Sequence, residues 1–319
     1  MGSDSLQSSP TVSVLIAAYN AEAFLRRAVL SALEQTVPVL EVLIVDDAST
    51  DGTAGVVKEL AAADDRIRLV SLLQNGGPSV ARNAGLDLAR GQWIVVLDAD
   101  DAMLPDRLAG MLQVAAASGA DIVVDNLRYY TPASNTAGPP VLEERDGGFE
   151  VVALQDFLSR ARPFNQETDW GLLHPMFRRA FLDSKGLRYP IRSRHGEDFL
   201  LLVEAFLQGA RYVLSRRAGY LYTGRESGLS RTTVNYPLMW EHTEALMGDP
   251  RIAGNTLLVE RLRERAAALK RLLTEKQLAS YWHERDYRAI AHRLLFDPGT
   301  RAVVRQKINR RLRNAVLSG

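Results

Sequence analysis

Three carboxylates follow directly on an apolar run near one third of the way along the chain. Asp98, Asp100 and Asp101 come after residues 93–97, and no lysine or arginine lies within five residues of them on either side. A solvated turn can also carry three acids, so this segment alone leaves a structural and a functional interpretation open. A second apolar run, residues 41–45, ends in a similar way, because acids follow it at Asp46, Asp47 and Asp51.

Two acidic segments brought to one edge of a sheet would repel each other. Crowded carboxylates raise one another's pKa values and lower stability unless cations or hydrogen-bond donors compensate them. A hard divalent cation, Mg²⁺ or Mn²⁺, takes oxygen ligands and typically shares its coordination with the phosphates of a substrate. The sequence therefore predicts a phosphate-bearing substrate held through a metal ion.

The elements that would position these acids alternate between strands and helices. Strands are expected at 12–17, 41–45, 67–72 and 93–97, and helices at 23–34, 53–63 and 79–89. Strands almost free of polar residues that alternate with helices predict an α/β fold with a mostly parallel sheet and helices on both faces. Ligands of such sheets bind beyond the carboxyl ends of the strands, which is where both acidic segments should lie.

The rest of the chain indicates four regions. A strand is expected at 120–125, a loop rich in Pro, Gly, Thr and Asn at 131–148, helices at 151–162, 176–185 and 196–209, and extended chain at 211–223. Beyond Pro250 the pattern is helical. We expect a disordered tail at 1–10, one half of an α/β domain at 11–130, the other half of the same domain at 131–235, and a basic helical extension at 236–319.

Composition limits the classes of protein that remain. The chain has 319 residues, 46% of them hydrophobic, and no cysteine, which is typical of a globular protein in a reducing compartment. The first ten residues lack the pattern of a signal peptide, and no run of eighteen apolar residues occurs. We therefore expect a cytoplasmic protein without a membrane-spanning segment.

Charge is distributed unevenly along the chain. Residues 1–250 carry 23 Lys and Arg against 32 Asp and Glu, a net charge of −9, whereas residues 251–319 carry 16 against 6, a net charge of +10. Residues 301–314 hold six basic residues and no acid, with apolar residues at helical spacing. This segment is compatible both with a peripheral contact to an anionic membrane and with a helix packed on the acidic part of the protein. It lacks interleaved aromatic residues, so we expect no nucleic-acid binding.

An ordered set of motifs resembles the family 2 glycosyltransferases of GT-A fold. The motifs are AYN (18–20), VDDASTDGT (45–53), NGGPSVARNAG (75–85), LDADD (97–101) and GED (196–198), within a similarity that covers roughly residues 11–230. The resemblance implies a GT-A fold and inverting transfer of a sugar from a nucleoside diphosphate, most often UDP, to an acceptor hydroxyl. It also implies a divalent metal, Mn²⁺ or Mg²⁺, and a saccharide or lipid-linked saccharide acceptor used in building a bacterial surface polysaccharide.

The resemblance assigns the donor site to the first half of the chain. The nucleotide-binding residues would be Ala18, Tyr19, Asn20, Asp47, Arg82, Asp98 and Ala99. On this assignment Tyr19 and Asp47 border the base, Arg82 reaches the base or a phosphate, and Asp98 binds the ribose. Asp100 and Asp101 are the candidate metal ligands.

The catalytic base is expected in the second half. Asp198 matches the catalytic acid of the family, and Glu197 beside it would make acceptor or structural contacts. An acid at the start of a helix can also act as an ordinary cap, and the helix dipole lowers the pKa that a base needs.

Four further residues are candidates for the acceptor site or a lid: Trp170, His174, His195 and Arg225. Residues 222–230 keep one arginine of the Tyr-Arg-x-Arg segment that many relatives have, which weakens the assignment of Arg225 to a phosphate lid. The two histidines fit no zinc pattern, and His174 could equally line the core.

Two other functions compete with sugar transfer. A nucleotidyltransferase would need a glycine-rich, lysine-bearing loop after the first strand, and residues 17–23 contain neither glycine nor lysine. A non-catalytic sugar-nucleotide-binding protein would not need Asp98, Asp100 and Asp198 together.

Overall fold

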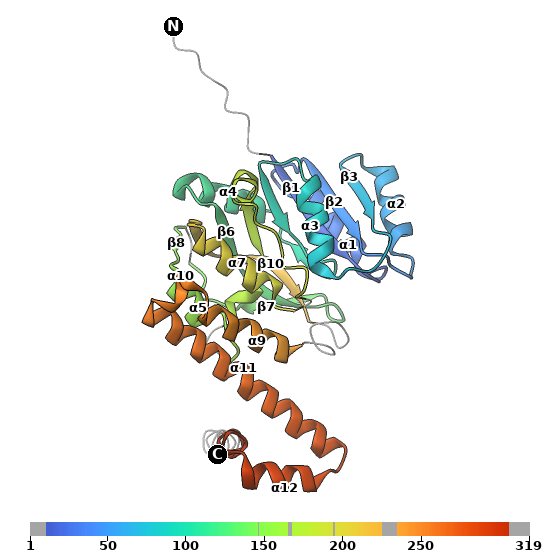
Figure 1. Ribbon diagram of the computed structural model, residues 1–319. Helices are drawn as coiled ribbons and strands as arrows, with labels where there is room; N and C mark the ends of the chain where they lie inside the picture. Colours follow the sequence, from blue (N-terminus) through green and yellow to red (C-terminus); the bar gives the residue numbers. More distant parts are fainter. Residues whose placement is uncertain (1–10, 146, 165–167, 194, 225–234, 306–319) are drawn as a thin grey trace.

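A ten-stranded mixed sheet forms the centre of the molecule, with helices packed on both of its faces (Figure 1). The computed structural model describes residues 11–145, 147–164, 168–193, 195–224 and 235–305. The main path of the sheet runs β3-β2-β1-β4-β9-β6-β10-β5, and β7 and β8 pair off this path.

The first half of the chain forms the parallel part of the sheet. Its strands are β1 (Val12–Ala18), β2 (Glu41–Asp46), β3 (Ile67–Ser71) and β4 (Trp93–Val96). The helices between them are α1 (Leu25–Leu33), α2 (Thr53–Ala63) and α3 (Pro78–Leu88). All seven elements lie where the alternation of apolar runs predicts them. β1, β2 and β4 are buried on both faces, whereas the edge strand β3 is mostly half-buried.

The second half completes the sheet with strands of both directions. They are β5 (Ala102–Met103), β6 (Ile122–Thr131), β7 (Thr136–Pro140), β8 (Glu150–Val151), β9 (Pro175–Arg178) and β10 (Tyr212–Thr223). The helices are α4 (Arg107–Ser118), α5 (Leu154–Arg160), α6 (Arg179–Lys185) and α7 (Glu197–Leu207), with a short 3₁₀ turn at Trp170–Leu172. β10 runs parallel to β6, whereas β9 runs antiparallel to both β4 and β6.

Two predictions of local structure in this half were wrong in part. Residues 176–185, expected as a helix, begin with strand β9 before α6. The helix expected at 151–162 is present as α5, which is shorter at both ends. The expected loop at 131–148 contains β7, which forms a hairpin with β6. Short apolar runs such as that of β9 carry too few residues to distinguish a period of 2 from one of 3.6.

A buried carboxylate lies at the amino-terminal end of β2, opposite the acidic loops. The side chain of Glu41 is fully buried and accepts hydrogen bonds from Ser13 Oγ (2.7 Å), Arg68 Nη1 (2.5 Å) and the Arg90 backbone N–H (2.8 Å). Burial by itself would raise the pKa of Glu41, but these donors lower it below its ordinary value. The network joins β1, β2, β3 and the loop before β4.

Helices form the described part of the C-terminal region. They are α9 (Tyr236–Met247), α10 (Pro250–Ala253), α11 (Thr256–His283) and α12 (Tyr287–Phe296). The first part of α11 packs on α5 and α9 through buried residues that include Leu258, Leu262 and Leu269, whereas no residue of α11 beyond Thr274 is buried. Residues 306–314 of the basic segment lie outside the described residues. Among the described helices, none combines the length and the apolar character that crossing a bilayer requires.

Candidate active site

The loops after β1, β2 and β4 meet at one edge of the sheet, as the parallel order of these strands requires. β1 pairs with β2 so that Ala18 lies opposite Asp46, and the loop with Tyr19 and Asn20 follows. Asp98 follows β4 on the other side of β1. Ala18 and Ala99 are buried, and the Tyr19 ring is 45% exposed.

Asp47 holds a glycine-containing loop in place. Its buried carboxylate accepts hydrogen bonds from the Asn75 side-chain amide (2.9 Å) and from the backbone N–H groups of Gly76 and Gly77 (both 2.8 Å). Gly77 has φ = 86°, a left-handed conformation that glycine adopts without strain. Asp47 thereby fixes the start of α3. The role at the base that the resemblance implies stays a prediction.

The other acids after β2, Asp46 and Asp51, accept hydrogen bonds from backbone N–H groups of their own loop. Asp46 Oδ1 accepts from the Ser49 backbone N–H (3.1 Å), and Asp51 Oδ1 accepts from the Thr53 N–H (3.0 Å) at the start of α2. Asn20 Oδ1 accepts from the Thr50 N–H (2.8 Å) and so ties the β1 loop to the β2 loop. On this side, backbone N–H donors thus offset part of the repulsion expected between the two acidic segments.

Arg82 joins the donor half of the site to the start of α7. From α3, its guanidinium contacts Asp98 Oδ1 (3.0 Å), Glu197 Oε1 (2.8 Å) and Asp198 Oδ2 (3.5 Å). The Arg82 side chain is 8% exposed, and the negative charges around it raise its pKa although burial opposes this. Arg82, Asp98 and the adjacent pair Glu197–Asp198 lie far apart in the sequence, and the fold brings the three acids within ion-pair distance of Arg82.

The pair Glu197–Asp198 begins α7, after Gly196 in a left-handed conformation (φ = 77°). Burial raises the pKa of Glu197, and the neighbouring charge of Asp198 raises it further, while Arg82 lowers it. Glu197 is therefore the buried partner of Arg82, and Asp198, whose side chain is 32% exposed, faces the crevice more openly.

Asp98 carries hydrogen bonds on both carboxylate oxygens. Arg82 donates to Oδ1, and His174 Nε2 lies 3.2 Å from Oδ2. Burial alone would raise the pKa of Asp98, but His174 and Arg82 hold it well below its usual range. In return, Asp98 raises the pKa of His174 against the effect of burial. The imidazole ring stacks on Tyr220 with 4.0 Å between ring centroids.

Asp101 is the buried acid of the LDADD segment. Its carboxylate accepts from the Tyr220 hydroxyl and from the Thr223 backbone N–H, both at 2.7 Å. Burial, with the charges of Asp98 and Asp100, raises the pKa of Asp101 to about 7. Asp100 is partly buried, and its backbone carbonyl accepts from Arg27 (2.6 Å).

Asp98, Asp101 and His174 form a group that fits a metal ion. One ligand atom from each lies within 4.8 Å of the other two. Burial first, and then the charges of Asp98 and Asp100, raise the pKa of Asp101, and a bound cation would oppose both effects. The sequence did not point to His174 as a ligand, because the residue reaches Asp98 only through strand β9, which the sequence pattern failed to predict.

The remaining candidates lie in different surroundings. Trp170 is fully buried beneath the guanidinium of Arg160 (4.5 Å to the ring centroid), so its side chain offers no surface to an acceptor in this structure. His195 is partly buried in the loop before α7. Arg225 lies outside the described residues.

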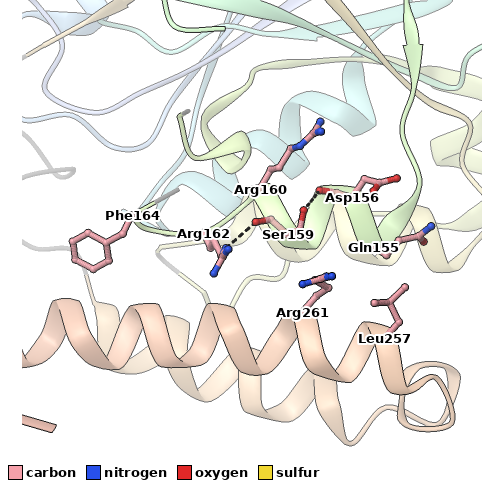
Figure 2. Close-up of a pocket in the computed structure, with 8 residues that line it drawn as sticks. All are labelled: Gln155, Asp156, Ser159, Arg160, Arg162, Phe164, Leu257 and Arg261. Atoms are coloured by element: carbon pink, nitrogen blue, oxygen red, sulfur yellow. Dashed lines mark hydrogen bonds between the residues drawn. The ribbon is translucent and has the colours of Figure 1, made fainter. Parts of the chain in front are cut away.

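A cavity among the described residues lies away from this site. About 590 Å³ in volume, it lies between α5 and the start of α11, and Figure 2 shows the residues that line it, among them Arg160, Arg162 and Arg261. Each of these arginines already contacts a carboxylate: Arg160 contacts Glu150, and the other two contact Glu264. These three arginines are therefore already paired with carboxylates of the protein, which disfavours this cavity as a phosphate site.

A parallel sheet whose carboxyl edge gathers acids, an arginine and a candidate metal group is typical of enzymes that bind nucleotides. The model of the family "Glycosyl transferase family 2" matches residues 13–182. The chain belongs to this family and is a glycosyltransferase.

Two similar proteins come from Rhizobium meliloti (strain 1021). The succinoglycan biosynthesis protein ExoO is 38% identical over 77% of this chain and 69% of its own length. The succinoglycan biosynthesis protein ExoU is 33% identical over 81% of this chain and 75% of its own length.

The fold is similar to that of a solved glycosyltransferase structure. The match to the crystal structure of S. aureus TarS 1–349 in complex with UDP-GlcNAc covers 80% of this chain and 72% of the TarS chain. Its TM-score is 0.64 and the sequence identity is 23%. This likeness confirms the predicted GT-A-like α/β fold.

Proposed function

We propose that this glycosyltransferase transfers a sugar from a UDP-sugar to a hydroxyl of a saccharide or lipid-linked saccharide, with inversion and with Asp198 as the general base. The observation that carries the proposal is the Arg82 network. It sets Asp198, at the start of α7, across from Asp98, at the end of β4, with one guanidinium between them. A base on one side of a bound sugar and a diphosphate site on the other is the arrangement that a single displacement requires.

The donor is proposed as a UDP-sugar on two grounds. TarS, which shares the fold, was crystallised with UDP and with UDP-GlcNAc. In this chain, the half-exposed ring of Tyr19 offers a flat surface beside the edge of the sheet where a nucleotide would lie. The Asp47 carboxylate accepts three side-chain and backbone hydrogen bonds and keeps acceptor capacity for a base N–H.

A divalent cation, Mn²⁺ or Mg²⁺, is part of the proposal. Asp98, Asp101 and His174 would hold it, and Asp100 lies beside them in the sequence. Such an ion offsets the negative charge that develops on a departing nucleoside diphosphate. Asp98 keeps its charge because Arg82 and His174 lower its pKa, and the Tyr220 hydroxyl orients Asp101.

The acceptor class rests on the relatives, whose names place them in succinoglycan biosynthesis. A saccharide chain in the course of assembly would present the hydroxyl that Asp198 deprotonates. The cytoplasmic, membrane-peripheral location expected from the sequence belongs to the same proposal.

Donor binding tests the metal part of the proposal. UDP should raise the melting temperature strongly in the presence of Mn²⁺ and little in its absence, because a ligand stabilises the native state in proportion to its affinity. Asp101→Asn should reduce this metal-dependent shift, whereas Asp87→Asn, which changes an exposed acid paired with Arg188, should leave it unchanged. An equal shift by UDP with and without the metal would contradict the metal assignment.

The rate of sugar transfer tests the assignment of Asp198 as the general base. Asp198→Asn should leave the UDP-induced shift close to that of the wild type and reduce sugar transfer by about 10²-fold or more, the usual scale for the loss of a general base. Glu204→Gln, a substitution in the same helix at an acid paired with Arg251, is the matched control. If Asp198→Asn turns over at a rate near that of the wild type, Asp198 is a helix cap and the base lies elsewhere.

A further inference from the structure

Large apolar side chains are exposed together at the end of α11 and along α12. Tyr287, Leu295, Phe296 and Trp282 have exposed fractions between 56% and 72%. Trp282 and Tyr287 contact each other edge to face, with 5.7 Å between their ring centroids. Burying side chains of this size is normally favourable, so a group of them in contact with water points to an interaction surface.

The exposed apolar residues of α12 are spread over one half of the helix surface, with Leu295 between Tyr287 and Phe296 at the two borders. Tyr287, Ala291 and Leu295 follow one another at intervals of four, and so do Arg288, His292 and Phe296 in the adjacent row. All six are exposed. The opposite face, with Ala289, Ile290, Arg293 and Leu294, is partly buried. We call the exposed face formed by these two rows, together with Trp282, the α12 face.

The charge of this segment is suited to an anionic partner. Residues 282–319 carry nine Lys and Arg against three Asp and Glu. Trp and Tyr, which join an apolar ring to a polar group, are the residues enriched where proteins meet the headgroups of a bilayer, and arginine is attracted to anionic lipids. A second copy of the chain would bring two basic segments together, so a symmetric dimer through this face would be repulsive.

The position of α12 also favours a flat partner. It lies at the end of α11 that is far from the sheet (Figure 1). A helix in the plane of a bilayer buries its apolar face about 5–10 Å deep, and the position of α12 at the end of a long helix leaves it accessible to such a surface.

We propose that the α12 face docks on the surface of an anionic lipid bilayer. The sequence pattern left such a contact open for residues 301–314, whereas the exposed apolar side chains described above belong to α12 and the end of α11. This inference rests on the membrane-peripheral location in the proposed function and names the surface that makes the contact. It does not depend on the sugar or the acceptor.

Vesicle binding by the full chain tests the proposal. The wild type should sediment with vesicles of phosphatidylcholine and phosphatidylglycerol and much less with vesicles of phosphatidylcholine alone, and salt should weaken the binding. Among the tryptophans, all of which are described, Trp282 is the exposed one. Its fluorescence should therefore shift to shorter wavelength on binding, and Trp282→Phe should abolish the shift.

The triple variant Tyr287→Gln, Leu295→Gln, Phe296→Gln should lower vesicle binding by about tenfold or more, since three apolar side chains would no longer leave water. Its melting temperature should match that of the wild type, because these side chains make few contacts in the protein. Leu88→Gln, at an exposed leucine of α3, is the control and should bind as the wild type does. Equal binding by the triple variant, or no binding of the wild type to anionic vesicles, would overturn the proposal. So would a wild-type dimer that the triple variant dissociates in the absence of lipid.

Discussion

Arg82 compensates carboxylates that come from two distant parts of the chain. Asp98 follows β4, and Glu197 and Asp198 begin α7, so one guanidinium offsets charge from both sides of the crevice. The role of such an arginine is hard to assign from its residue type alone. The family resemblance implied that Arg82 contacts a base or a phosphate. The partners became visible only when the fold brought residues 82, 98 and 197 together.

Arg82→Met should destabilise the protein by about 3 kcal/mol, because it leaves buried carboxylates without a cation. This value lies at the low end of the range for breaking a buried ion pair, because the Asp98 and Asp198 side chains are 33% and 32% exposed. Urea unfolding measures the change. Arg66→Met, at an exposed arginine paired with Asp64, should cost less than about 1 kcal/mol. Equal effects of the two substitutions would show that the Arg82 network contributes little to stability.

At the scale of elements, α11 is anchored to the catalytic part of the molecule by a buried arginine. The Arg265 guanidinium lies 3.6 Å from the centroid of the Phe199 ring and donates a hydrogen bond to the Ala161 carbonyl. Burial raises the pKa of Asp169, and the charge of Arg265 opposes that rise. The helix that the sequence placed in a separate extension thus contacts α7 one residue after Asp198.

Arg265→Met should lower the free energy of unfolding by about 2–4 kcal/mol, because it removes a buried cation that faces Phe199 and the charge of Asp169. Calorimetry or urea unfolding checks this value. Adding Asp169→Asn should restore part of the loss, since a neutral side chain needs no cation. Arg261→Met, four residues earlier on α11 and 31% exposed, is the matched control. Equal losses of unfolding free energy in Arg265→Met and Arg261→Met would show that Arg265 does not anchor α11.

Much of the structure of residues 11–130 was predictable, and less of that of residues 131–235 was. β1 to β4 and α1 to α3 follow from repeated apolar runs of strand length, and these strands carry the acidic loops to one edge. The positions of His174 and Tyr220 depend on β9 and β10, of which β9 is too short to have a readable period. A candidate metal group that includes His174 was therefore beyond what spacing could indicate.

For the whole molecule, the carboxylate of Glu41 makes stability depend on pH. Its pKa is lowered in the folded state, so the stabilisation is present above the unfolded value and is lost as pH falls through the folded one. In the wild type the free energy of unfolding should fall on acidification over this range, whereas in Glu41→Gln it should be lower at neutral pH and fall less. Urea unfolding at a series of pH values measures both slopes. Parallel slopes would show that Glu41 does not contribute to acid sensitivity.

Strand β9 also determines when the sheet can close during synthesis. It pairs with β4 on one side and with β6 on the other, yet it follows them in the chain by some fifty residues or more. Until residues 175–178 leave the ribosome, β4 and β6 each present an open edge of apolar strand, and such edges invite pairing with other chains. The nascent protein is thus exposed to aggregation through the synthesis of its middle third. The late arrival of four residues closes the gap between β4 and β6, and β10, which is later still, covers the other edge of β6.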